Sequence, residues 1–190
     1  MRRLLICPLV LACAISALAQ FPVGGGKIGR SFGDLAAEQR LLVSNYCRLD
    51  FNGARLSTEG WQQIRQLTSF RENPDFNTVF IVSRCQVVPN KEPSYDINVN
   101  YVVIGRYEEG VGYAPFPGTR TVQFETGGKE MHITGIDSTT PFVSRQALVT
   151  WLKTKLAVAS TSSQRSVIEN SIKALEASAA ASAAASKSAP

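Results

Sequence analysis

Hydrophobic and polar residues follow a helical period in the segment after residue 33. Asp34 is a good N-cap, and Asn52-Gly53 has the chemistry of a helix stop, so we expect one helix between them. The expected apolar face consists of Leu35, Leu42, Tyr46 and Leu49, with Val43, Cys47 and Asp50 beside them.

A second, shorter helix is expected directly after this stop. Ser57 or Thr58 can cap it, and Asn73-Pro74 is expected to end it. Its inner face is expected to carry Trp61, Ile64 and Leu67.

The pattern changes to period two in the middle of the chain. Residues 77–88 and 95–108 alternate apolar and polar positions and are rich in β-branched side chains, which predicts two strands joined by a proline-bounded turn. Residues 109–118 contain glycines and prolines, and we expect them to form a loop that carries Tyr113 and Phe116.

A hairpin is predicted around Gly127-Gly128, which has the composition of a two-residue turn. This turn sets a register in which His132 lies on the polar face, away from Phe124. The expected pairs are Phe124 with Met131, Val122 with Ile133, Gln123 with His132, and Glu125 with Glu130. The last pair places like charges opposite each other, which is mildly unfavourable.

The C-terminal part returns to a helical period. Ser144 can cap a helix over 145–158, and a second helix is expected over 163–176. Their apolar faces carry Leu148, Trp151, Leu152 and Leu156 in the first helix, and Ile168, Ile172 and Leu175 in the second. The final residues, ASAAASAAASKSAP, offer no large apolar side chain to bury.

These segments predict an α+β fold with helices packed on a curved antiparallel sheet and additional helices at the C-terminus. The expected organisation is a signal peptide over 1–19, a flexible arm over 20–33, a domain over 34–158, a C-terminal helix within 159–176 and a disordered Ala/Ser-rich tail over 177–190.

The N-terminal leader predicts export. Arg2 and Arg3 precede a long apolar run that ends in Ala17-Leu18-Ala19, so we expect cleavage before Gln20 and a periplasmic or extracellular location. Lipidation at Cys13 is an alternative that the apolar residues after it disfavour.

Charge and composition exclude some classes of function. The formal net charge is +5, two of these charges belong to the leader, and the basic residues are scattered, so we expect no nucleic-acid partner. With one histidine and few cysteines we expect neither a metal site nor a cofactor. After cleavage Cys47 and Cys85 remain, and they form either a disulfide or two buried thiols.

The order of elements, together with the phrase LDFNGARLSTEGW at the junction of the first two helices, resembles the cone-shaped nuclear-transport-factor-type superfamily, which includes SnoaL-like and ketosteroid-isomerase-like proteins. The resemblance covers residues 34–140 and implies an apolar pocket at the wide end of the cone. Enzymatic members use an acid–base group there, and other members bind ligands or partners. The resemblance therefore implies a pocket without implying an activity.

Two kinds of function follow. The first is a binding or interaction module without catalysis, whose partner is a small apolar ligand, a second copy of the chain across the sheet face, or an envelope protein docked on the C-terminal helices. The alternative is an isomerase or dehydratase with Asp50 as general base and Tyr46 or His132 assisting. The expected ligand-binding residues are Tyr46, Asp50, Trp61, Tyr101, Tyr113 and Phe116.

Overall fold

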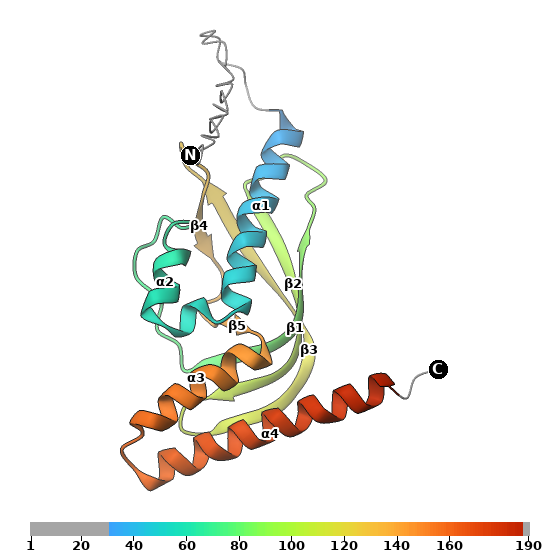
Figure 1. Ribbon diagram of the computed structural model, residues 1–190. Coiled ribbons are helices and arrows are strands. Elements are labelled where there is room, and N and C mark those ends of the chain that lie inside the picture. The colour runs from blue at the N-terminus through green and yellow to red at the C-terminus, as the bar shows by residue number, and fades with distance from the viewer. Residues whose placement is uncertain (1–30, 188–190) are drawn as a thin grey trace, which may run out of the picture.

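A computed structural model describes residues 31–187, with side chains described to residue 179. The expected signal peptide and most of the expected arm lie outside these residues. The fold is α+β, as the sequence predicts (Figure 1). Its elements are α1 (Phe32–Phe51), a 3-10 turn η1 (Ala54–Leu56), α2 (Thr58–Ile64), β1 (Thr78–Val88), β2 (Asp96–Glu108), β3 (Gly112–Gly127), β4 (His132–Ile136), β5 (Phe142–Val143), α3 (Arg145–Val158) and α4 (Ser162–Lys187).

The first helix begins earlier than its sequence predicts. Ser31 is the N-cap, and its hydroxyl accepts a hydrogen bond from the backbone N–H of Asp34. Asp34 therefore lies in the first turn, where a carboxylate favours the positive end of the helix dipole. Gly53 adopts the left-handed conformation at the end of the helix (φ 85°), and Ser57 caps α2, both as expected. The second helix ends at Ile64, well before Asn73.

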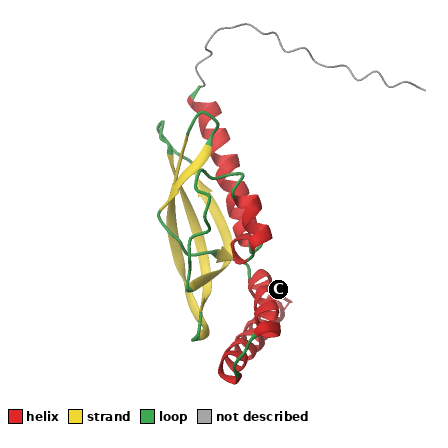
Figure 2. Ribbon diagram, turned by 90° about the vertical axis from the view of Figure 1, so that its left-hand side faces the viewer, coloured by secondary structure: helices red, strands yellow, loops and turns green. Residues whose placement is uncertain are grey.

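The sheet has the strand order β4-β3-β2-β1-β5. β1 to β4 form an antiparallel meander, whereas β5 pairs with β1 in parallel at Phe80 and Ile81, so the expected antiparallel sheet has one parallel edge. The long strands bend strongly. In the rotated view the helices lie to one side of the sheet, α1 along its upper part and the C-terminal pair at its lower end (Figure 2).

Two hydrophobic clusters hold these elements together. The α1 cluster lies between α1, α2 and the sheet, and includes Val43, Tyr46, Trp61, Val99, Tyr101, Phe124 and Phe142. The α3–α4 cluster joins the C-terminal helices to the other end of the strands, and includes Val79, Ile81, Tyr107, Leu148, Leu152, Ile172 and Leu175. Among the helices in the described part of the chain, none combines the length and apolar character that a membrane span requires.

The expected loop over 109–118 is a strand for most of its length. A short turn over 109–111 leads directly into β3, and residues 112–118 pair with β2. β4 pairs only with the far end of β3, at residues 124–127, so the first half of β3 is a sheet edge. Proline cannot donate to a neighbouring strand, but this is harmless at an edge, so Pro115 and Pro117 are compatible with a strand there.

The predicted hairpin register is wrong. Phe124 pairs with Ile136, Glu125 with Gly135, Thr126 with Ile133 and Gly127 with His132, and a bulge follows Glu125. The turn is longer than the two glycines, with Gly128 in the left-handed conformation. The longer turn separates Glu125 from Glu130 and avoids their repulsion.

The structure of the C-terminal helices corrects one expectation. α4 continues to Lys187, so the tail expected to be disordered from 177 is helical over most of its length. Alanine has the highest helix propensity, which allows the helix to continue without further packing. The apolar face of α4 is buried, with Leu175 fully enclosed, and an envelope partner on the C-terminal helices stays a prediction.

Candidate functional site

The residues expected to form an apolar pocket form a packed core instead. Tyr46, Trp61 and Tyr101 are buried, and the ring of Tyr101 stacks on that of Phe142 with 4.1 Å between centroids. The edge of Tyr46 packs on Phe124 at 5.3 Å. These aromatic side chains pack against one another and against neighbouring rings in the core. None of them lines the clefts described below.

The two loop aromatics are also structural. Tyr113 and Phe116 lie in β3 and are half-buried. Tyr113 packs tightly over Gly105, where a Cβ atom would lie 2.6 Å from the ring. Phe116 stacks on Phe80 at 6.0 Å, and the guanidinium of Arg120 lies over both rings.

The raised pKa of Asp50 would suit a general base, but its side chain is buried away from any substrate. It is 1% exposed, and its Oδ2 accepts a hydrogen bond of 2.9 Å from the backbone N–H of Phe142, which ties α1 to β5. Burial raises its pKa to about 6, although the positive charge of Arg55 acts in the opposite direction. Because Asp50 lines none of these clefts, its raised pKa reflects burial in the core and gives no support to the alternative of an isomerase or dehydratase.

His132 does not join Asp50. It lies in β4 and lines a polar cleft of about 590 Å³ with Arg65 and Arg71. Its Nδ1 donates a hydrogen bond of 2.6 Å to the carbonyl oxygen of Glu130. Tyr46 lies near Asp50, but burial raises the pKa of its phenol far above the usual value, which keeps it neutral.

Two buried polar residues were missed by the sequence analysis. Arg55, 3% exposed, donates hydrogen bonds to Thr139 O and to Asn73 Oδ1 and so holds the η1 turn to two loops. Gln39, fully buried, donates from Nε2 to Ser94 O and Thr126 Oγ1, each at 2.8 Å. Both residues connect segments far apart in the sequence, so no local pattern could identify them.

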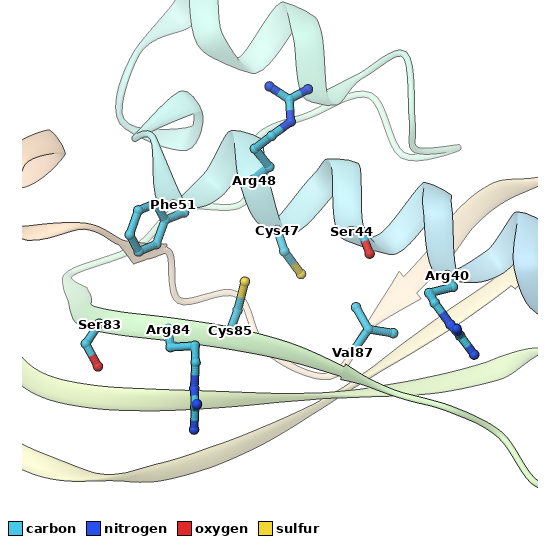
Figure 3. A pocket seen from close by; sticks show the side chains of 9 residues that line it. All are labelled: Arg40, Ser44, Cys47, Arg48, Phe51, Ser83, Arg84, Cys85 and Val87. Atoms are coloured by element: carbon cyan, nitrogen blue, oxygen red, sulfur yellow. The ribbon is translucent and has the colours of Figure 1, made fainter.

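The cleft with the most distinctive chemistry lies between α1 and β1 (Figure 3). It has a volume of about 520 Å³. One helical stripe of α1 and four residues near the middle of β1 line it: Arg40, Ser44, Cys47, Arg48, Phe51, Ser83, Arg84, Cys85 and Val87. Three of these are arginines and none is acidic, so the groove has a basic rim, although the head groups of Arg48 and Arg84 point away from the two thiols in Figure 3.

Cys47 and Cys85 face each other across this cleft (Figure 3). Both are free thiols. The Cys47 thiol lowers the pKa of Cys85, which is half-buried, whereas the interaction with Cys85 together with burial raises the pKa of Cys47. The Cys47 thiol also lies 3.3 Å from the Tyr101 hydroxyl. The two cysteines that the sequence analysis considered together are free thiols on the two sides of this cleft, and a disulfide between them stays a prediction.

β1 also offers a free backbone edge beside this cleft. β2 pairs with one side of β1 along its whole length, but β5 pairs with the other side only at Phe80 and Ile81. Within the described residues, Val82–Val88 have no strand partner on that side. Their outward N–H and C=O groups are therefore available for another extended segment.

A larger cleft of about 970 Å³ separates the end of α1 and the start of α2 from α3. Its walls include the polar side chains of Thr58, Glu59 and Lys155 and the ring of Trp151. This surface has mixed character, with neither a free strand edge nor a concentration of one charge.

No family model, curated protein or solved structure matches this chain. The resemblance to the cone-shaped superfamily therefore stays a prediction. What the protein binds has to be inferred from the geometry of its own surface.

Proposed function

We propose that this protein is an interaction module that binds an extended, acidic segment of another protein in the α1–β1 groove. The observation that carries the proposal is the coincidence of a free strand edge with a basic groove beside it. An extended peptide added to such an edge gains main-chain hydrogen bonds, and the neighbouring side chains supply specificity.

The arginines suggest the spacing of acidic residues in the partner. Arg40 and Arg48 lie eight residues apart on α1, a rise of about 12 Å along the helix axis. An extended strand covers about the same distance in four residues, at about 3.3 Å per residue, and residues four apart point to the same side of a strand. The spacing of these two arginines along α1 therefore favours two carboxylates at positions i and i+4, whereas Arg84 points to the opposite side of β1 from Cys85 (Figure 3).

The test is a binding measurement with short labelled peptides of valine and glutamate, read by fluorescence anisotropy. A peptide with glutamates four apart is expected to bind more tightly than one with glutamates three apart, whose carboxylates point to opposite sides. Arg40→Gln combined with Arg48→Gln should weaken binding at least tenfold and reduce its salt dependence. Lys129→Gln, at the exposed β3–β4 turn, is the matched control and should have no effect.

A second probe separates strand addition from simple charge attraction. Methylating the backbone nitrogens of the glutamate peptide removes main-chain donors without changing its charge, and should abolish binding. If the methylated peptide binds equally well, or if the arginine variants bind like the control, the proposal is wrong.

A further inference from the structure

Two thiols with different surroundings lie in the same cleft. Cys47 is 1% exposed and packs among Val43, Tyr46 and Tyr101 in the α1 cluster. Cys85 lies on β1, is half-buried and lines the open side of the cleft. In Figure 3 the two sulfur atoms point toward each other.

We infer that Cys47 and Cys85 form a redox-active pair. Cys85 attacks an external anionic disulfide, and Cys47 then attacks Cys85 and releases the thiol that is bound to it. The accessible thiol makes the first contact, because an external disulfide can enter the cleft but cannot reach the enclosed Cys47. The arginines around the cleft select a disulfide that carries carboxylates. The inference rests on the cleft and its thiols and does not require the peptide binding proposed above.

The reaction balances as two thiol–disulfide exchanges. The Cys85 thiolate attacks one sulfur of the external disulfide, breaks its S–S bond and forms a mixed disulfide. The released thiolate takes up the proton lost by Cys85. Cys47 then loses its proton, attacks the Cys85 sulfur and forms the Cys47–Cys85 bond, and the second external thiol leaves with that proton. The protein dithiol is oxidised and the external disulfide is reduced to two thiols.

The interaction between the two thiols supports this division of roles. Cys47 lowers the pKa of Cys85, so this thiol reaches the reactive thiolate form more readily. The interaction with Cys85 and burial keep Cys47 protonated. Cys47 therefore reacts after the mixed disulfide has formed, and the two side chains already point toward each other across the cleft (Figure 3).

The test uses the full chain with Cys7→Ser and Cys13→Ser, so that only this pair can react. The reduced protein is mixed with dithio-bis-nitrobenzoate, an anionic disulfide whose released thiol is coloured. The intact pair should release two equivalents and end as an internal disulfide with no bound nitrobenzoate, as seen by mass spectrometry. Cys47→Ser should release one equivalent and keep the adduct on Cys85, and Cys85→Ser should react at least tenfold more slowly until denaturant is added.

Two further measurements keep the outcome decisive. Arg40→Gln should slow the reaction with this anionic reagent but not with cystamine, a cationic disulfide, whereas Lys129→Gln should slow neither. Rapid-quench mass spectrometry of the intact pair should find the first adduct on the Cys85 peptide, which requires no serine variant to fold. The inference is overturned if Cys47 reacts first, or if the intact pair keeps the adduct instead of closing on itself.

Discussion

At the scale of single residues, the buried carboxylate of Asp50 lowers the stability of the core when it is ionised. Its Oδ2 accepts a hydrogen bond from Phe142 N, but its Oδ1 has no hydrogen-bond partner among the described residues. Burial raises the pKa of Asp50 from 3.8 to about 6, and Arg55 compensates only in part. The folded protein therefore binds a proton at Asp50 more tightly than the unfolded chain does.

This difference predicts a pH dependence of stability. The contribution of Asp50 is fully present below about pH 3.8 and is lost as the pH rises through about 6. At about 1.4 kcal/mol per pH unit, the ionised carboxylate costs about 3 kcal/mol at neutral pH. Asp50→Asn keeps an acceptor for Phe142 N without a charge, so it should be more stable than the natural chain at neutral pH and about equally stable near pH 4.

Urea denaturation between about pH 4 and pH 8 checks this prediction. The free energy of unfolding of the natural chain should fall relative to that of Asp50→Asn as the pH rises through this range. Other carboxylates titrate alike in both proteins and cancel in the comparison. Parallel curves would mean that Asp50 is solvated or paired in solution.

Residue-level predictions succeeded where a helical pattern carried the information. The helical period placed Tyr46, Cys47 and Asp50 near one another, and the structure buries all three. It could not distinguish a pocket from a filled core, because this depends on Phe142 and Phe124, which arrive from distant parts of the chain. The roles of Gln39 and Arg55 depend on similarly distant partners.

At the scale of elements, α2 packs unusually closely on the η1 turn. A Cβ atom at Gly60 would lie 2.5 Å from the carbonyl oxygen of Ala54 and 2.6 Å from its Cα. Both are backbone atoms, so the contact cannot be relieved by a change of rotamer. Gly60 therefore sets the distance between these two segments.

Gly60→Ala should destabilise the fold by about 1–3 kcal/mol, the usual cost of overpacking. This result would run against helix propensity, which by itself favours alanine by about 1 kcal/mol. Gly118→Ala is the matched control, because nothing lies within 4 Å of its added Cβ and its φ is not positive. Thermal unfolding should show a lowered midpoint for the first variant and little change for the second. An unchanged midpoint for Gly60→Ala would show that α2 can move away from η1.

The elements themselves could mostly be predicted, and the errors have local physical causes. Alternation located β1 and β2 to within a few residues. The first half of β3 was missed because prolines usually exclude a strand, and here they lie on an unpaired edge. The predicted β3–β4 register was wrong because Gly127-Gly128 has the composition of a two-residue turn. The actual connection is longer, and a bulge follows Glu125.

At the scale of the whole molecule, β1 and β2 join the two hydrophobic clusters. Val79 and Tyr107 belong to the α3–α4 cluster, whereas Val82 and Val99 on the same two strands belong to the α1 cluster. A change in the packing of one cluster therefore affects strands that also belong to the other cluster. The C-terminal helices are expected to unfold together with the rest of the domain.

Leu175→Ala tests this coupling, because Leu175 lies fully buried in the α3–α4 cluster. Removing its side chain should cost about 2–5 kcal/mol, whereas Lys173→Ala on the exposed side of the same helix should cost little. Trp61 belongs to the α1 cluster and Trp151 packs against the α3–α4 cluster, so Trp151→Phe and Trp61→Phe each leave one local fluorescent reporter. In each of these two single-tryptophan variants, Leu175→Ala should lower the midpoint of unfolding by the same amount. A loss confined to the Trp151 signal would instead make α3 and α4 a separate folding unit, because two-state unfolding requires both signals to change together.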